Sequence, residues 1–313
     1  MNPSEKLLGQ IKTLNETLWD HQANEPRVKQ WLGHFDDPKD SVSDRLHALY
    51  LLSSFSYFNQ RLLRELLHAM FRDRIRYPVI SDIRRRHDDT TDVELIRSEF
   101  KKVLGRTRFL GIGNPSESGT HLLYLFRQAN RLDKELFIHT HEVFDWTQSR
   151  PTVLDEIDRL VFIDDLAGSG TQAIRYSRGF VKQVKAQKPN LHIAYHMLFA
   201  TTKALAQIRR TTQFDQVDAV CELDDSFRCV ADESRYFPAN VEGVTLEAAR
   251  EMARRYGQQL AGKATALGFK NGQLLLGFAH NIPNNTLPIL WHRGHSNRRW
   301  SPLFERHDKI LNT

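Results

Sequence analysis

Two adjacent acids, Asp164 and Asp165, stand between a run of apolar residues and a turn of small residues. The apolar run, residues 160–163, predicts a buried strand that ends at the carboxyl edge of a sheet, where open α/β folds bind their ligands. In the turn, backbone N–H groups and the dipole of the following helix would bind a phosphate. The residues expected to surround that phosphate are Ala167, Gly168, Ser169, Gly170 and Thr171.

Carboxylates beside a phosphate site indicate a particular ligand. The oxygen atoms of Asp164 and Asp165 would accept hydrogen bonds from the 2′ and 3′ hydroxyl groups of a ribose. The ligand predicted from these residues is therefore a ribose 5-phosphate. The alternative is a chance acidic turn before a helix, and the agreement of strand, acids, turn and helix argues against it.

A second loop of small residues, 113–120, follows a predicted strand and leads into an amphipathic helix. It is not a Walker A loop, because Gly119 stands where that motif requires lysine. Either this loop binds an anion at the start of the helix, or it is an ordinary helix cap. The candidate binding residues are Ser116, Glu117, Ser118, Gly119 and Thr120.

The histidines argue against a metal centre. His139 and His141 lie two residues apart, and Asp145 occupies the position at which a zinc-protease helix has its second histidine. His196 falls in a predicted buried strand, where a core histidine with satisfied hydrogen bonds is expected.

The region that contains the candidate site, residues 106–237, has the pattern of a parallel sheet. Short apolar runs alternate with amphipathic stretches, as in successive βα units. Ala173, Tyr176, Phe180 and Val184 form an apolar stripe at helical spacing after the acidic turn. Strands are expected at residues 108–112, 136–139, 160–163, 192–200 and 217–221. The predicted fold class is α/β, with a mostly parallel sheet flanked by helices.

Regions with other patterns flank this core, so we expect three parts: 1–105, 106–237 and 238–313. The first part carries apolar residues at helical spacing and predicts an N-terminal helical extension, with its long helical stretch ending at Pro78. The last part begins with a helix capped by Thr245 and continues with a hairpin signal, the pair Asn271 and Gly272.

Charge and hydropathy limit the possible partners. The 313 residues carry a net charge of +6, which suits contact with a polyanion such as nucleic acid, although short basic runs are equally typical of solvated surface. No apolar run reaches the length of about 20 residues that a membrane-spanning helix needs. The first ten residues lack the pattern of a signal peptide. We therefore expect a cytoplasmic protein without a membrane partner.

Residues 160–171 read as four hydrophobic residues, two acids, a hydrophobic residue, small residues, glycine and threonine. This stretch resembles the phosphoribosyl-diphosphate (PRPP) binding motif of type I phosphoribosyltransferases. The resemblance implies that Asp164 and Asp165 contact the ribose hydroxyls and that the loop at 113–120 binds pyrophosphate. It also implies a Mg²⁺ cofactor, held indirectly by the two acids, and displacement at C1 of the ribose. Two positions depart from common versions of the motif: many members have Thr or Ser in place of Gln172, and purine-type members have an acid in place of Gly168.

Over most of its length the chain is similar to a narrower group, the phosphoribosyltransferase-like proteins of bacterial conflict systems, called PRTase-CE. The region around Trp31 and Phe35 resembles the N-terminal extension of that group, and residues 281–291 resemble its C-terminal signature. The resemblance implies a hood over the site, in which amides read a base edge and tryptophan stacks on a base. Its residues would be Asn284, Asn285, Thr286 and Trp291. The alternative is a proline-braced loop packed by Trp291 and Trp300.

The resemblance implies an enzyme that acts on PRPP or a ribonucleotide, as a phosphoribosyltransferase or an N-glycosidic hydrolase. Such an enzyme would be the effector of an anti-phage system such as a retron, with a defence-system protein, a nucleic acid or a second copy of the chain as partner. The alternative is a non-catalytic sensor that binds PRPP or a nucleotide and recruits a nucleic-acid or protein partner. The helical extension and Gly168 argue against a housekeeping salvage enzyme.

Overall fold

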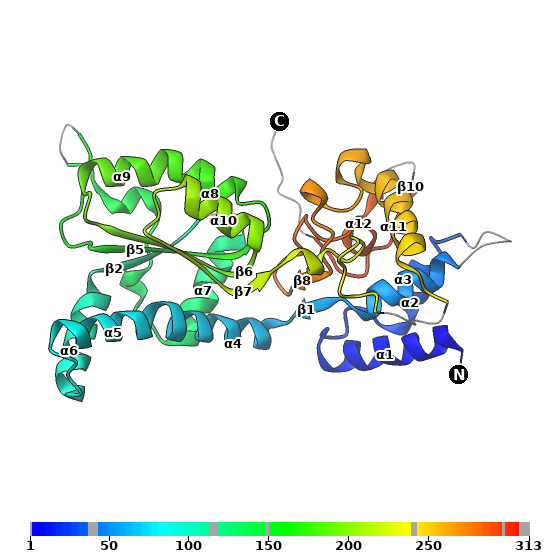
Figure 1. Cartoon of the computed structure of the whole chain (residues 1–313), viewed down its shortest axis with the longest axis horizontal. Helices are drawn as coiled ribbons and strands as arrows, with labels where there is room; N and C mark the ends of the chain where they lie inside the picture. Colours follow the sequence, from blue (N-terminus) through cyan, green and yellow to red (C-terminus); the bar gives the residue numbers. More distant parts are fainter. Residues whose placement is uncertain are drawn as a thin grey trace. The chain divides into compact units, whose positions relative to one another are not determined.

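A computed structural model of the chain describes residues 2–36, 43–112, 118–147, 150–238, 243–295 and 298–306. Contacts divide the chain into two compact units (Figure 1). The first unit combines Met1–Leu63 with Leu223–Thr313, and the second unit is Arg64–Glu222. This division differs from the three parts expected from the sequence, because helices near the start of the chain share one hydrophobic core with residues beyond 228.

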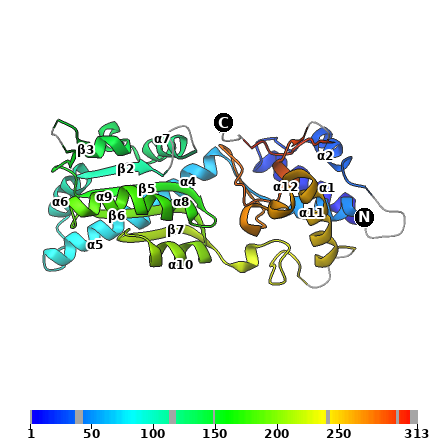
Figure 2. The same cartoon turned by 90° about the horizontal axis from the view of Figure 1, so that it is seen from above.

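The second unit is built on a four-stranded sheet with the strand order β2-β5-β6-β7, which Figure 2 shows from above. Its strands are β2 (Thr107–Gly111), β5 (Arg159–Ala167), β6 (His192–Thr201) and β7 (Gln216–Leu223). Both β2 and β6 pair with β5 in parallel, so that Ile163 lies between Gly111 and His196. The predicted α/β class with a parallel sheet flanked by helices is confirmed.

Helices cover both faces of this sheet (Figure 1). One face carries α8 (Thr171–Tyr176), α9 (Lys182–Gln187) and α10 (Thr202–Thr211), and along the other run α4 (Gln60–Met70) and α5 (Tyr77–Arg86). The unit also contains α6 (Val93–Gly105) and α7 (Ser118–Asn130). Phe162 of β5 lies 5.3 Å from the ring of Tyr176. Because both faces are covered, the strands carry unbroken apolar runs.

Two predictions for this unit are wrong. Residues 136–139 do not form a strand: 3₁₀ turns lie on either side, at Lys134–Leu136 and Thr140–Val143, and Phe137 pairs with Phe109 in an isolated bridge. Pro78 does not end the helical stretch either. A π-helical turn, Phe71–Arg76, connects α4 to α5, and the missing N–H of the proline falls in the first turn of α5.

The first unit gathers helices from distant parts of the chain around an aromatic core. They are α1 (Pro3–Thr17), α2 (Glu25–Leu32), α3 (Asp44–Ser53), α11 (Leu246–Ala261) and α12 (Pro288–Trp291). Strand β1 (Ser56–Phe58) pairs in parallel with β8 (Leu276–Phe278). Trp31 and Trp300 donate their indole N–H groups to one acceptor, the carbonyl oxygen of Ile289, at 2.7 and 3.0 Å. This shared acceptor ties α2 to the C-terminal region.

The hairpin predicted at Asn271 and Gly272 does not form. Asn271 and Gln273 adopt left-handed conformations, with φ of 57° and 54°. A Cβ atom on Gly272 would lie 2.7 Å from Cβ of Asn285, so this loop packs against residue 285, and β8 pairs with β1 instead. Two short antiparallel pairs complete the described strands: β3 (Phe144–Asp145) with β4 (Thr152–Val153), and β9 (Gly294–His295) with β10 (Arg298–Arg299).

Candidate functional site

The two predicted acids lie near the carboxyl end of β5. Asp164 is partly buried, and both of its oxygen atoms accept hydrogen bonds. Oδ2 accepts from the hydroxyl of Tyr195 at 2.7 Å, and Oδ1 accepts from the backbone N–H of Asp165 at 2.9 Å. Tyr195 lies on the neighbouring strand β6 and is 1% exposed. In the described part of the chain, no basic side chain forms an ion pair with Asp164, so the carboxyl group is held in place without being neutralised.

The surroundings of Asp164 raise its pKa to about 8. The largest cause is burial, which disfavours the charged carboxylate, and the negative charge of Asp165 adds to it. The hydrogen bond from Tyr195 lowers the pKa and offsets these two causes only in part. Asp164 therefore holds its proton more strongly than an exposed aspartic acid does, and a cation or a hydrogen-bond donor brought to the site would favour the ionised form.

The turn after the acids leaves backbone N–H groups available for an anion. Gly170 has a φ of 69°, and a Cβ atom there would lie 2.9 Å from Cγ1 of Ile208, so glycine alone fits without strain. The carbonyl oxygen of Gly168 accepts a hydrogen bond from the hydroxyl of Thr201 at 2.9 Å, which orients the turn. The N–H groups of Ser169 and Gly170 have no acceptor among the described residues.

Helix α8 begins directly after this turn and contributes the positive end of its dipole. Thr171, the first helical residue, is exposed, and its hydroxyl lies 3.1 Å from the hydroxyl of Ser169. The helix continues through a π-helical turn, Ser177–Val181, into α9. The structure thus gathers the predicted phosphate-binding residues 168–171 in one turn, with Ala167 as the buried last residue of β5.

The second predicted loop leaves the same edge of the sheet, because β2 and β5 are parallel neighbours. Ser116 and Glu117 lie outside the described residues. The other three candidates, Ser118, Gly119 and Thr120, form the first turn of α7. Gln172 of α8 donates a hydrogen bond to the carbonyl oxygen of Ile112 at 3.4 Å, which links the acidic turn to the end of the segment that follows β2.

A model of one known protein family covers most of this sequence. The model of the PRTase-CE family matches residues 28–306. The chain belongs to the PRTase-CE family. Among curated proteins, no sequence matches it. A solved structure of Helicobacter pylori xanthine-guanine-hypoxanthine phosphoribosyltransferase is similar at 10% identity and a TM-score of 0.26, over 54% of this chain and 88% of that chain. Within the described ranges, no helix combines the length and the apolar composition that crossing a membrane requires.

Two of the predicted hood residues of this PRTase-CE protein donate side-chain hydrogen bonds to backbone carbonyl groups of the first unit. Asn285 is 8% exposed, and its side-chain amide donates to the carbonyl oxygen of Phe269 at 3.1 Å. Thr286 is fully buried, and its hydroxyl donates to the carbonyl oxygen of Leu276 at 2.6 Å. Both side chains therefore hold the loop that follows β8.

The other two hood residues line a cavity of 460 Å³ in the same unit, together with His292. Asn284 accepts a hydrogen bond from the backbone of the neighbouring loop through its carbonyl oxygen. The indole of Trp291 donates to the carbonyl oxygen of Thr286 at 2.9 Å, and the guanidinium of Arg306 lies over its ring at 5.2 Å. The side chain of Asn284 and one edge of Trp291 thus border this cavity.

The histidines form no metal centre in the described ranges, where three or more metal-binding side chains do not gather at any point. The rings of His139 and His141 stack at 5.8 Å. The expected core position of His196 is confirmed, since the residue lies in β6 and is 1% exposed, but its Nδ1 has no hydrogen-bond partner in the described structure. Burial, the largest cause, lowers the pKa of His196 to about 4, so it stays neutral.

Tyr195, whose hydroxyl donates a hydrogen bond to Asp164, was not predicted as a site residue from the sequence. A signal was present, since Tyr195 is the only hydroxyl-bearing residue in the apolar run 193–200. A buried tyrosine requires a hydrogen-bond partner, and the neighbouring parallel strand ends in two acids. Only the register of β5 against β6 decides which acid it meets.

Proposed function

We propose that this PRTase-CE protein is a phosphoribosyltransferase-like enzyme that acts at C1 of the ribose of PRPP or a ribonucleotide, by transfer or by hydrolysis, as an effector of anti-phage defence. The observation that carries the proposal is the turn after β5. Two carboxyl groups and two N–H groups for which the described residues provide no acceptor lie within seven residues of one another, at the edge where parallel sheets bind ligands.

Each group of this turn would act on a different part of the ligand. The N–H groups of Ser169 and Gly170 and the hydroxyl of Thr171 would bind the 5′-phosphate. Asp164 and Asp165 would accept hydrogen bonds from the ribose hydroxyls. When the bond at C1 breaks, positive charge develops on the sugar, and the nearby carboxylates stabilise that charge. Tyr195 would keep Asp164 in position throughout.

The acids fit a Mg²⁺ ion held indirectly. Carboxylate oxygen atoms are the ligands that Mg²⁺ prefers, and the ion usually keeps several waters and contacts the phosphates of its substrate. The raised pKa of Asp164 marks a place where negative charge is unfavourable without a cation. Asp164 and Asp165 would hold the ion through water or through the ribose hydroxyls, and the ion would neutralise a departing pyrophosphate.

The test is phosphorus NMR of the purified protein with PRPP, NAD and ribonucleotides in the presence of Mg²⁺. We expect pyrophosphate or ribose 5-phosphate to be released. Asp165→Asn should slow this release by about 10²–10³-fold, as expected when a charge-stabilising group is lost. Asp155→Asn, an exposed acid of the same unit, is the matched control and should retain full turnover. Full turnover in Asp165→Asn would contradict the assigned role of the pair.

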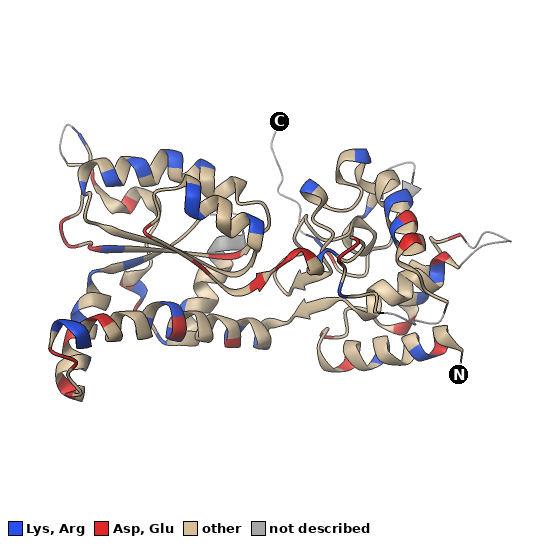
Figure 3. Cartoon of the chain, in the orientation of Figure 1, with Lys and Arg blue, Asp and Glu red and all other residues tan. Residues whose placement is uncertain are grey.

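A non-catalytic sensor is the second candidate, and the protonation of Asp164 favours it, because a neutral carboxyl group stabilises developing positive charge poorly. In that case PRPP or a nucleotide would bind without turnover. Exposed Arg175, Arg178 and Lys182 follow one another at helical spacing along α8, the π-helical turn and α9 (Figure 3). This row suits a nucleic-acid partner, whose affinity would fall steeply with added salt.

A further inference from the structure

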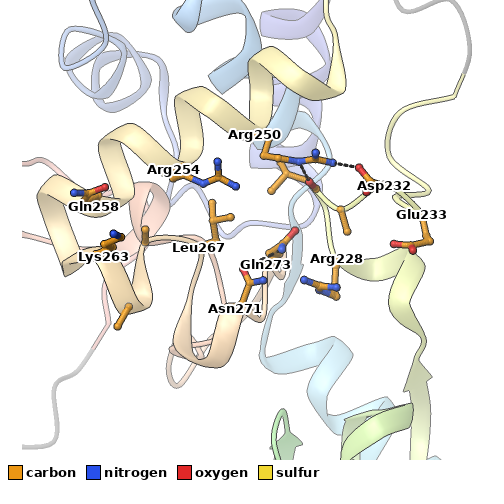
Figure 4. Close-up of a pocket in the computed structure, with 14 residues that line it drawn as sticks. Arg228, Asp232, Glu233, Arg250, Arg254, Gln258, Lys263, Leu267, Asn271 and Gln273 are labelled. Atoms are coloured by element: carbon orange, nitrogen blue, oxygen red, sulfur yellow. Dashed lines mark hydrogen bonds and ion pairs between the residues drawn. The ribbon is translucent and has the colours of Figure 1, made fainter.

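A second cavity, of 530 Å³, lies in the first unit and plays no part in the function proposed above. Helix α11 forms one side, and a loop containing the 3₁₀ turns Lys263–Thr265 and Phe269–Asn271 forms another. The segment after Asp225–Phe227 completes the wall. Figure 4 shows Arg254 extending from α11 near Leu267, whereas Arg250 extends toward Asp232. The volume is in the range of pockets that hold small-molecule ligands.

Basic groups dominate the charged lining. The side chains of Arg228 and Lys263 have no ion-pair or hydrogen-bond partner among the described residues. Where the structure describes the chain, the side chain of Arg254 has only a distant ion pair, with Glu251 at 4.0 Å. Arg250 is the one basic lining residue with a close acidic partner in the described structure, Asp232 at 2.5 Å. Three cations that lack close partners, gathered around one cavity, favour an anionic ligand, and guanidinium groups match the geometry of phosphate.

A buried amide at the same cavity lacks a hydrogen-bond donor. Gln273 is 4% exposed, and its Nε2 donates to Oδ1 of Asn271 at 3.0 Å, which fixes the orientation of the amide. Its Oε1 has no donor in the described structure. Leaving a buried acceptor unpaired costs free energy, and a ligand with N–H or O–H groups would remove that cost. This side chain therefore leaves an unpaired acceptor in the wall of the cavity, covered by its neighbours unless a ligand displaces them.

The backbone holds this amide in a strained loop. Gln273 has a φ of 54°, its N–H donates to the carbonyl oxygen of Leu267 at 2.8 Å, and its carbonyl oxygen accepts from the N–H of Cys229 at 2.9 Å. Lys270 and Asn271 are also left-handed. A non-glycine residue in this conformation costs free energy, and such residues cluster at ligand sites. The loop keeps Gln273 at the cavity although a relaxed backbone would be more stable.

We infer that this cavity is a binding site for a nucleoside monophosphate, separate from the acidic turn of the second unit. The phosphate would lie among Arg228, Arg254 and Lys263. Hydrogen-bond donors of the base or the ribose would meet Gln273 and Asn271. A bare phosphate offers Gln273 no N–H group, and an uncharged nucleoside leaves the three cations without an anion. A ligand that carries both a phosphate and hydrogen-bond donors matches the cations and the amide of the lining.

The experiment is calorimetric titration of the full-length Ser169→Asp variant with AMP, GMP, CMP and UMP. In this variant a carboxylate in the turn after β5 repels phosphate there. At least one nucleotide should bind with a Kd between about 1 μM and 1 mM, and the affinity should fall with added salt. Adding Lys263→Ala or Arg254→Ala should weaken binding by about tenfold or more. The matched control, Lys29→Ala, removes an exposed lysine from the same unit and should change nothing.

A further variant separates ligand binding from folding. Gln273→Met keeps the size of the side chain and removes the unpaired acceptor, so the melting temperature of the protein without ligand should not fall, while nucleotide affinity should fall. Adenosine, ribose 5-phosphate and inorganic phosphate are the partial probes, and each should bind more weakly than the nucleotide. Equal binding by ribose 5-phosphate would overturn the assignment of a base.

Two results would overturn the site itself. One is the absence of nucleotide binding in Ser169→Asp when the unmodified chain binds, which would place the only nucleotide site in the acidic turn and leave the proposed function intact. The other is nucleotide binding that Lys263→Ala, Arg254→Ala and Gln273→Met leave unchanged. Loss of turnover in Asp165→Asn with pocket binding retained would support both proposals separately.

Discussion

In the second unit, the acidic turn joins β5 to the helix that follows it directly in sequence, and the strand on either side of β5 pairs with it in parallel. In the first unit, β1 pairs with β8, and Trp31 shares an acceptor with Trp300. The second unit therefore presents a site made by neighbouring residues, whereas the first makes its cavity from segments that meet only in the folded chain. Local elements can be read from sequence, and distant pairings cannot.

The chemistry of the two sites differs in the same way. The turn after β5 offers carboxyl groups and backbone N–H groups, which suit the hydroxyls and the phosphate of a sugar phosphate. The cavity beside α11 offers cationic side chains and a buried amide. The first site combines carboxyl side chains with main-chain N–H groups and the second relies on side chains alone, so substitutions should affect them differently.

The largest effect is expected from Trp31→Ala, which tests whether the units lose stability independently. Trp31 is fully buried, so removing its ring should destabilise the first unit by about 3–5 kcal/mol. Hydrogen exchange measured by mass spectrometry should show faster exchange in Met1–Leu63 and Leu223–Thr313. Trp146→Ala, which removes a side chain that is 61% exposed, is the control and should change stability by less than about 0.5 kcal/mol. Equal loss of protection in both units would show that they unfold together.

A smaller effect, in the second unit, is expected from Gly170→Ala. The left-handed backbone and the contact with Ile208 should cost about 1–3 kcal/mol, and the displaced turn should bind PRPP more weakly. Gly179→Ala is a matched control, because a Cβ atom there meets nothing within 4 Å and the residue is helical, so stability should rise slightly. Urea unfolding measures the stability of both variants. Equal stability of the two variants would mean that the turn tolerates a side chain.

An effect of the opposite sign, which depends on pH, is expected from Asp164→Asn. Between the unfolded pKa of about 3.9 and the folded pKa of about 8, the folded chain keeps a proton that the unfolded chain has lost. The free energy of unfolding therefore falls as pH rises through this range. Asparagine cannot ionise, so the variant should become progressively more stable than the parent as pH rises from 4 to 8, and the two should differ least near pH 4. Urea midpoints measured from pH 4 to 8 that run parallel in the two proteins would exclude this linkage.

The difference between local and distant contacts also explains which elements of the fold could be predicted from the sequence. The strands at 108–112, 160–163, 192–200 and 217–221 were predicted because parallel strands are buried on both faces and read as apolar runs. The short run at 136–139 has the same composition, but the 3₁₀ turns on either side prevent it from pairing along its length. Composition alone does not distinguish the two cases.

The candidate site could likewise be predicted from the sequence only in part. The acids and the turn residues are adjacent in sequence, so their proximity needed no knowledge of the fold. The contact of Tyr195 with Asp164 depends on the register of two strands, and the contact of Gly170 with Ile208 depends on how α10 packs. The cavity beside α11 depends on left-handed residues such as Gln273, which no hydrophobic pattern indicates. Tertiary packing determines these features.

The pairing of β1 with β8 has a consequence for how the chain folds while it is being synthesised. Residues Arg64–Glu222 leave the exit tunnel between the two halves of the first unit, so they can fold while the segment containing Trp19 and Trp31 still waits for its partners. At typical rates of translation that wait lasts on the order of 10 s or more, with large aromatic side chains uncovered. A chain whose synthesis stops before α11 exposes those rings permanently and becomes a substrate for chaperones and proteases.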